Sequence, residues 1–235
     1  MNVFYAPEAS DGLALLSEEE SRHCVKVLRM RTGQELNLTN GKGDWFTGVL
    51  AQADPRACMV EIREKTNGFG QRPVRLHMAV APTKQIERFE WFLEKATECG
   101  IDEITPVLCE KSERSVVRHD RLEKVLLSAM KQSLRAYLPK LNPAVRLKDF
   151  LKLPATGSRY IAHCGDGEKS GFAQSCPAGK DALVLVGPEG DFSLDEVMMA
   201  KHQGFSQVSL GQHRLRTETA ALALCIAFNL KNELL

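Results

Sequence analysis

Two short polar segments of the sequence combine residue types that could bind a ligand or move a proton. The first is VGPEGDFS (residues 186–193), in which two glycines flank Glu189 directly after a run of apolar residues. The second is LGQHRLRTETA (residues 210–220), which leads into a long apolar stretch. Glycines let a backbone approach a ligand closely, while carboxylates and arginines can move protons or stabilise charge. A simpler interpretation stays open for the first segment, a tight strand-to-helix turn with Ser193 as N-cap.

Neither segment matches a phosphate-binding loop. The first lacks the G-K-[ST] of a P-loop and does not match the G-x-G-x-x-G of classical dinucleotide-binding folds. In the second, Arg214, Arg216 and Glu218 could form only a surface ion-pair cluster, and Thr217 and Thr219 are both candidates to cap the following helix. Because ligands of open α/β sheets bind beyond the carboxyl ends of strands, the two segments still predict a ligand site.

The cysteines and histidines do not indicate metal chemistry. The seven cysteines are scattered and include no C-x-x-C pair, which predicts reduced thiols rather than a disulfide framework or a zinc site. His163, Cys164 and Cys176 do not make a recognised ligand spacing. We therefore expect no bound metal and no cysteine nucleophile.

The rest of the chain predicts the elements that must position the two segments. Up to about residue 66, the strands ELNLTN, WFTGVLA and ACMVEIREK surround a GKGD turn, which is typical of a small β barrel. In the same region Ser17 and Glu20 form a capping-box signature at the start of one helix. The segment NGFGQRP (67–73) has the composition of a linker. After it, strands alternate with helices, which indicates a mostly parallel sheet with helices on both faces.

Three helices of the second region have distinct patterns. Apolar residues at helical spacing from Ile86 end at Gly100, a C-terminal cap, and a second helix with the same spacing is expected to end at Pro139. The last helix contains nine consecutive apolar residues, 220–228, without a polar face. A helix that is apolar all round is expected to be buried all round, either in the core or at a subunit interface.

Composition bounds the class of protein. The 235 residues are 43% hydrophobic and 26% charged, with a net charge of +1 and no apolar run long enough to span a membrane. The first residues do not have the pattern of a signal peptide, so we expect a cytoplasmic protein that is not associated with a membrane. Basic residues cluster between Lys111 and Lys148, and Arg22, Lys26 and Arg29 are spaced i, i+4, i+7. These clusters could be solvated faces or an electrostatic footprint for RNA.

The two segments together resemble the paired signatures of a known family. LVGPEGDFS and SLGQHRLRTETAAL are similar to the motifs of SPOUT-class methyltransferases that make 3-methyluridine in 16S ribosomal RNA, the RsmE family. APTKQIERFEWFLEKATECGIDEITPVLCEKSER and SAMKQSLRAYLP resemble its upstream elements, so the likeness spans essentially the whole chain. Two departures are His213 and Arg214, which stand where the family has Arg and a hydrophobic residue. A third is PTKQIERFEW in place of P-K-G-D-R-F-E-W.

The resemblance implies a fold and an activity. It implies a PUA-like β-barrel domain over 1–70 that binds RNA and an α/β methyltransferase domain over 73–235 tied into a deep trefoil knot. It implies a homodimer that uses S-adenosylmethionine to methylate N3 of a uridine in the 16S ribosomal RNA of the small subunit. The residues it assigns to the cofactor are His163, Gly187, Glu189, Gly190, Leu210, Gly211, Leu215, Arg216, Thr217 and Thr219.

The chemistry of N3 methylation suggests roles for three charged residues. N3 of uracil carries a proton at neutral pH, so a base must remove it or a cation must stabilise the anion that forms. We expect Arg216 to have the electrostatic role and Glu218 or Glu189 to be the base. We expect RNA contacts from Arg22, Lys26, Arg29, Arg114 and Arg118. The alternatives are a SPOUT enzyme for another RNA nucleotide and a non-catalytic RNA-binding assembly factor.

Overall fold

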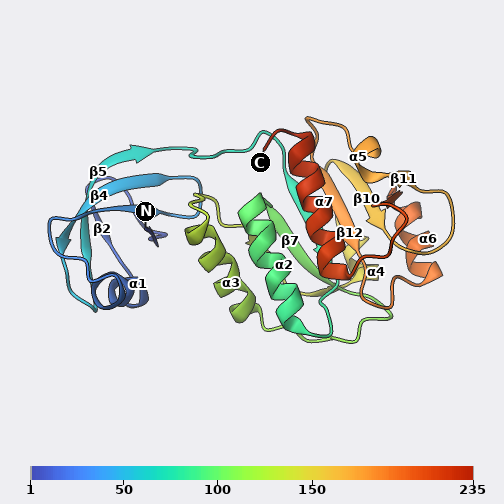
Figure 1. Cartoon of the computed structure of the whole chain (residues 1–235), viewed down its shortest axis with the longest axis horizontal. Coiled ribbons are helices and arrows are strands. Elements are labelled where there is room, and N and C mark those ends of the chain that lie inside the picture. The colour runs from blue at the N-terminus through green and yellow to red at the C-terminus, as the bar shows by residue number, and fades with distance from the viewer. Residues whose placement is uncertain (1, 235) are drawn as a thin grey trace. The chain divides into compact units, whose positions relative to one another are not determined.

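The computed structural model describes residues 2–234, which divide into two compact units. Unit 1 consists of the chain up to Gln71 together with Leu127–Leu138, and unit 2 consists of Arg72–Leu126 and the chain from Pro139 onward (Figure 1). Nothing in the sequence pattern singled out the short segment Leu127–Leu138 as part of unit 1. Its contacts there include Thr39 Oγ1, which donates to Ala136 O at 3.1 Å.

Unit 1 is built on a five-stranded sheet in the order β1-β3-β4-β5-β2. Its strands are β1 (Val3–Tyr5), β2 (Leu13–Leu15), β3 (Glu35–Thr39), β4 (Trp45–Gln52) and β5 (Met59–Thr66). Neighbouring strands are antiparallel, except that β1 and β3 run parallel. The sheet curls around an apolar core that includes Phe4, Leu38 and Phe46. The expected barrel is therefore a half-barrel with β1 and β2 at its edges.

The helical segment of unit 1 is shorter and less regular than the sequence predicted. It begins with α1 (Glu18–Arg22) and continues as the π-helix η1 (His23–Val27). Ser17 accepts from Glu20 N at 3.2 Å, which confirms the N-cap, but the Glu20 carboxylate bonds Lys131 Nζ at 2.5 Å instead of closing a capping box. Arg29 lies beyond the helix with a left-handed φ of 55°. The prediction that three basic residues share one regular helix is therefore wrong, because the π-helical winding ends before the third.

Unit 2 is built on a parallel sheet in the order β11-β13-β10-β12-β6-β7-β8, with β9 also paired to β7. The five longer strands are β6 (Leu76–Val80), β7 (Glu103–Leu108), β10 (Ser158–Ala162), β12 (Ala182–Val186) and β13 (Ser206–Ser209). The short additions are β8 (Lys140–Leu141), β9 (Val145–Arg146) and β11 (Ser170–Gly171). Every residue of β12 is buried, which explains its unbroken apolar run. The predicted parallel α/β architecture is confirmed.

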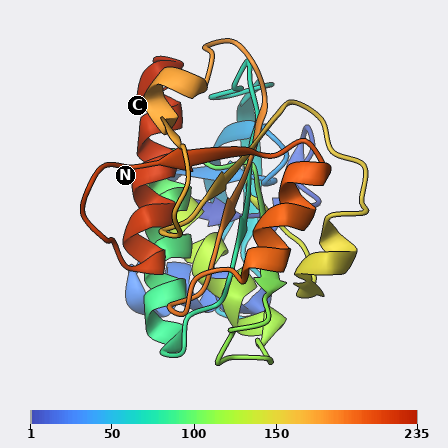
Figure 2. The same cartoon turned by 90° about the vertical axis from the view of Figure 1, so that its right-hand side faces the viewer.

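Helices cover both faces of this sheet. On one side lie α2 (Ile86–Cys99) and α7 (Thr217–Lys231), with the short α5 (Phe172–Ser175) against α7. The other side carries α4 (Leu147–Phe150) and α6 (Leu194–His202), as Figure 2 shows.

The ends of the helices test the capping predictions. Gly100, with φ 103°, ends α2, and Ser193 caps α6 in a complete capping box with Glu196, so both predictions are confirmed. In contrast, α3 (His119–Gln132) stops well before Pro139, because Leu134 turns the chain with φ 56°.

The apolar helix α7 is buried on one face and not all round. Ala221, Leu224, Cys225 and Phe228 are buried at helical spacing. The opposite face is half-buried, and Leu230 is 62% exposed. The prediction of burial on every side is therefore wrong for a single chain. Within residues 2–234, no helix is both long and apolar enough to cross a membrane.

Candidate functional site

The strand order of unit 2 brings the two polar segments to adjacent positions. Strand β10 pairs in parallel with β13 on one side and with β12 on the other. The loops that follow all three strands therefore leave the same edge of the sheet as neighbours. We call residues 187–192, after β12, the first loop and residues 210–216, after β13, the second loop. His163 follows β10, between them.

The first loop is held by hydrogen bonds from four other parts of unit 2. Glu189 Oε1 accepts from Lys84 N at 3.0 Å, and Asp191 Oδ2 accepts from Cys164 N at 2.8 Å. Thr217 Oγ1, at the start of α7, donates to Gly187 O at 3.0 Å, and Lys111 Nζ donates to Phe192 O at 3.3 Å. The loop is thus joined to the segments after β6, β7 and β10 and to the last helix. Glu189 therefore braces the loop between β6 and α2 through one of its oxygens.

The glycines of the first loop are favoured by close packing within the loop and against Lys111. A Cβ added at Gly187 would lie 3.0 Å from Cδ2 of Phe192 in the same loop, and one added at Gly190 would lie 3.0 Å from Cβ of Lys111. Both distances are shorter than ordinary van der Waals contact. The structure therefore supplies a packing reason for each glycine that does not depend on a ligand.

The second loop is exposed along its length. Its two leucines are unusual for a solvent-facing loop, since Leu210 is 37% exposed and Leu215 is 41% exposed. Gly211 has a φ of 128°, which favours glycine. Exposed apolar side chains beside a backbone position without a side chain suit contact with a flat, partly apolar ligand.

The start of α7 corrects two sequence expectations. Arg216 is the N-cap, without a side-chain hydrogen bond, so neither Thr217 nor Thr219 caps the helix. The Thr217 hydroxyl is instead used on the first loop, and Thr219 is exposed. The surface ion-pair cluster also does not form, because Glu218 is buried and faces Arg88 of α2 at 4.0 Å.

Glu218 is the most unusual carboxylate of this region. It is 7% exposed, and its Oε2 has no hydrogen-bond partner among residues 2–234. It lies in the first turn of α7, where the helix dipole favours a negative charge. Arg88 was not singled out from the sequence, although it belongs to the upstream segment TKQIERFEW. A buried carboxylate oxygen without a hydrogen-bond partner is unusual, which marks Glu218 as a candidate functional residue.

His163 is held by the neighbouring strand. Its Nε2 lies 3.0 Å from Gln207 Oε1 of β13, and its carbonyl oxygen accepts from Lys169 Nζ at 3.1 Å. Burial lowers the pKa of His163 below its ordinary value, and the positive charge of Lys169 lowers it further. The imidazole is therefore neutral near pH 7.

The basic residues considered for RNA contacts have different environments. Arg22 pairs with Glu18 at 2.6 Å and Arg118 pairs with Asp120 at 2.9 Å, both at exposed positions. Lys26 and Arg29 make no ion pair within the described part of the chain. Exposed pairs are weak and can exchange for phosphate contacts.

Arg114 is engaged by the segment after β6. Its Nε donates to Thr83 O at 3.0 Å and its Nη2 donates to Lys84 O at 2.7 Å. Lys84 in turn pairs with Glu113 at 2.6 Å. The Arg114 side chain therefore supports the segment at Thr83 and Lys84, which also donates a backbone hydrogen bond to Glu189. No group of His, Cys, Asp and Glu that could hold a metal ion occurs among residues 2–234.

Comparison with known proteins defines the class. The RNA methyltransferase domain family matches residues 70–229, and the RNA methyltransferase PUA domain family matches residues 16–63. The chain therefore belongs to the RNA methyltransferase family, of the kind that carries a PUA domain.

Several individual relatives are named as ribosomal RNA methyltransferases. A protein of Aquifex aeolicus named ribosomal RNA small subunit methyltransferase E is 28% identical, over 95% of this chain and 97% of its own. The structure of a probable rRNA-methyltransferase from Porphyromonas gingivalis is 39% identical, covers 99% of both chains and superposes with a TM-score of 0.90. That of a ribosomal RNA small subunit methyltransferase E from Neisseria gonorrhoeae, bound to S-adenosyl methionine, is 29% identical over 99% of this chain and 98% of its own, with a TM-score of 0.83.

Proposed function

We propose that this protein uses S-adenosylmethionine to methylate N3 of a uridine in the 16S ribosomal RNA of the small ribosomal subunit. The observation that carries the proposal is the match to the RNA methyltransferase family over residues 70–229, in a chain whose two signature loops leave the strands on either side of β10. Relatives named ribosomal RNA small subunit methyltransferase E, one of them bound to S-adenosyl methionine, support the substrate and the cofactor.

The residues at this edge of the sheet fit the proposed cofactor. The exposed Leu210 and Leu215 suit the adenosine part, and Gly211 leaves backbone groups accessible. The first loop supplies a rigid wall because it is tied at Gly187, Glu189 and Asp191. When bound, S-adenosylmethionine supplies an electrophilic methyl group on a sulfonium.

The chain's own task is to position the uracil and to deal with its N3 proton. We assign proton acceptance to Glu218, because its Oε2 is uncommitted, whereas Glu189 already uses Oε1 on Lys84 N. Arg216, next to Glu218 at the start of α7, stabilises the negative charge that develops on the uracil ring. Precise alignment of donor and acceptor does the rest.

Access to N3 explains a separate RNA-binding domain. N3 lies on the Watson–Crick edge, so the uridine must be unpaired or extruded from a helix before it can react. We propose that the domain over 1–70 binds RNA through Arg22, Lys26 and Arg29. We propose a separate RNA contact for Arg118 in the domain over 73–235. Arg114 is proposed to act there mainly by supporting the turn at Thr83 and Lys84.

Three further properties belong to the proposal. The half-exposed apolar face of α7 supports a homodimer in which a second copy covers it. The family resemblance supports the trefoil knot in the domain over 73–235. A ribosomal RNA substrate supports a cytoplasmic location.

The decisive experiment measures methyl transfer with isotopically labelled S-adenosylmethionine. Small ribosomal subunits and naked 16S RNA from cells that lack the activity are offered in parallel, and the modified base is mapped. We expect a single 3-methyluridine. Labelling of another nucleotide would replace the assigned target. Cofactor binding without methyl transfer to either substrate would favour a non-catalytic assembly factor.

A further inference from the structure

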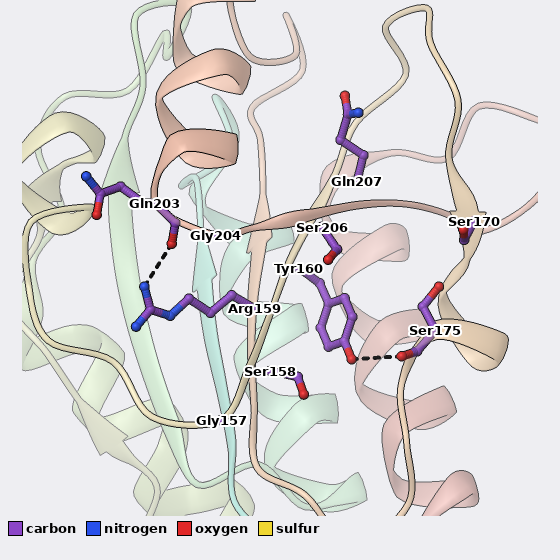
Figure 3. Close-up of a pocket in the computed structure, with 10 residues that line it drawn as sticks. All are labelled: Gly157, Ser158, Arg159, Tyr160, Ser170, Ser175, Gln203, Gly204, Ser206 and Gln207. Carbon is purple, nitrogen blue, oxygen red and sulfur yellow. Dashed lines mark hydrogen bonds between the residues drawn. The ribbon is translucent and has the colours of Figure 1, made fainter.

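Two cavities at the amino-terminal edge of the same sheet, opposite the two loops, differ in their lining. The smaller, of about 440 Å³, lies at the starts of β10 and β13 and is lined mostly by serines, glutamines and glycines (Figure 3). Its larger polar groups are already used, since Arg159 donates to Gln203 O at 2.8 Å and Tyr160 donates to Ser175 O at 3.0 Å. The larger cavity is different.

The larger cavity has about 870 Å³, a volume typical of sites for small organic ligands. It lies over the starts of β6, β7 and β12, on the face that carries α4. Much of its wall is apolar, with Phe150 and Leu151 from α4, Leu183 from β12, and Phe205 ahead of β13. It shares no residue with the first or second loop.

A connected polar cluster lines one side of this cavity. His77 Nε2 lies 2.8 Å from Thr105 Oγ1, and Asn142 Nδ2 donates both to Thr105 Oγ1 at 2.8 Å and to Glu103 Oε1 at 2.7 Å. Lys140 neutralises Glu103 at 2.9 Å. All five side chains belong to residues that line the cavity.

The hydrogen-bond inventory leaves two groups of the cluster available to a ligand. Thr105 Oγ1 accepts from Asn142 and lies against His77 Nε2, to which it donates in one tautomer of the imidazole and from which it accepts in the other. In both tautomers, neither His77 Nδ1 nor Asn142 Oδ1 has a protein partner within the described chain, so the cluster offers one ring nitrogen and one amide acceptor.

The His77 imidazole is neutral near pH 7. Burial lowers the pKa of His77, Lys140 and Arg75 lower it further, and Glu103 opposes them. The charged residues that line the cavity balance in number, since Arg75, Lys140 and Arg159 are matched by Asp102, Glu103 and Asp181. The cavity therefore presents hydrogen-bonding groups and apolar walls without a net charge.

We propose that this cavity is a second binding site, which takes a neutral planar heteroaromatic ring of the nucleobase type. Phe150 stands edge-on to the His77 ring, with 5.7 Å between centroids and an interplanar angle of 79°, so flat aromatic surfaces already bound the cavity. A nucleobase carries acceptors and donors side by side on its Watson–Crick edge, and these can pair with His77 Nδ1 and Asn142 Oδ1. The inference goes beyond methyl transfer, since the site lies at the opposite edge of the sheet.

The test titrates adenosine, cytidine, guanosine and uridine into the full chain, with binding followed by calorimetry and by NMR. Saturating S-adenosylhomocysteine is present throughout so that no nucleoside is scored for entering the cofactor site. A single-stranded oligoribonucleotide forms a second arm. Binding of nucleosides identifies a free ligand, and binding of the oligonucleotide alone identifies a base within RNA; both support the site if the variants below respond.

Two variants and two matched controls locate the binding. His77→Phe keeps a ring against Phe150 but removes the ring nitrogens, and we expect at least about tenfold weaker binding. Ala144→Trp starts from an exposed position at the cavity and should fill it without disturbing the fold. The controls are His202→Phe and Ala178→Trp, both at exposed positions outside the cavity. Absence of binding at millimolar ligand, or binding that Ala144→Trp leaves unchanged, would overturn the proposal, while the methyl-transfer assay remains a separate measurement.

Discussion

The first and second loops leave the strands on either side of β10 but are built in opposite ways. The first is tied to four other segments of unit 2, and its glycines are favoured by close contacts with Phe192 and Lys111. The second is exposed and carries Leu210, Leu215 and Arg216 without such ties. The difference indicates a division of labour, in which one loop provides a fixed wall and the other provides side chains that remain free for a ligand.

This comparison also separates the two carboxylates that sequence reasoning could not rank. Glu189 is exposed, yet one of its oxygens holds the backbone of Lys84. Glu218 is buried, yet one of its oxygens has no partner within residues 2–234. The exposed Glu189 therefore has a structural role, whereas the buried Glu218 retains an oxygen without a hydrogen-bond partner among residues 2–234.

The sharpest way to break the comparison is to neutralise each carboxylate. Glu218→Gln should lower the rate of methyl transfer by ~10²–10⁴-fold, because the proposed base is lost. Glu189→Gln should leave the rate within about threefold of wild type, since the amide oxygen still accepts from Lys84 N. Single-turnover rates with saturating cofactor measure both. A large loss in Glu189→Gln with none in Glu218→Gln would reverse the two roles.

Removing the cation of the second loop should give the next largest effect. Arg216→Ala is expected to reduce methyl transfer by ~10²–10³-fold, as for loss of a group that stabilises developing charge. Its melting temperature should change little, because the residue is exposed and caps α7 only through its backbone. His213→Ala, in the same loop, is the matched control. Equal losses in the two variants would argue against a specific electrostatic role.

The hydrogen bond between Thr217 of α7 and Gly187 of the first loop should affect the stability of the fold more than the rate of methyl transfer. Thr217→Val removes the hydrogen bond to Gly187 O from a buried site, at a cost of about 1–3 kcal/mol in the free energy of unfolding. Thr219→Val, two residues along the same helix and exposed, should cost less than about 0.5 kcal/mol. Urea denaturation of both variants measures the difference, and equal stabilities would show that the tie contributes nothing.

The smallest expected effect is on the pH dependence of stability, through His163 in the segment after β10. The pKa of His163 is lowered in the folded chain, so the unfolded chain binds the extra proton more readily. The contribution to stability is therefore complete above the ordinary value of 6.5 and is lost as the pH falls below it. His163→Gln should flatten the decline of unfolding free energy between about pH 7.5 and 5. An unchanged slope would mean that the His163 pKa is not lowered.

Much of the fold could be predicted because its signals are local. The unbroken apolar run of β12, the Ser193 cap and the Gly100 stop each depend on residues within a few positions. The N-cap of α7 could not be predicted, since the Thr217 hydroxyl binds a carbonyl thirty residues away. The π-helix in unit 1 and the place of Leu127–Leu138 likewise depend on contacts between distant segments.

The candidate site could also be predicted from the sequence only in part, because it too depends on contacts between distant segments. The sequence marks both polar segments and relates them to a family, but it does not contain the strand order that makes β12 and β13 the two neighbours of β10. Arg88 could have been noticed from its place in TKQIERFEW. Its approach to Glu218 could not, because 130 positions separate the two residues.

The sequence by itself determined the longer strands and most of the longer helices, the two polar segments and the RNA methyltransferase family, since these depend on residue types and short spacings. Only the tertiary structure decided which polar groups are already occupied. The Glu189, Thr217 and Arg114 side chains hold the backbone, while Glu218 and His77 each keep one uncommitted atom within the described chain. The physical reason is that a hydrogen bond depends on distance in space, and folding brings together partners that the sequence keeps far apart.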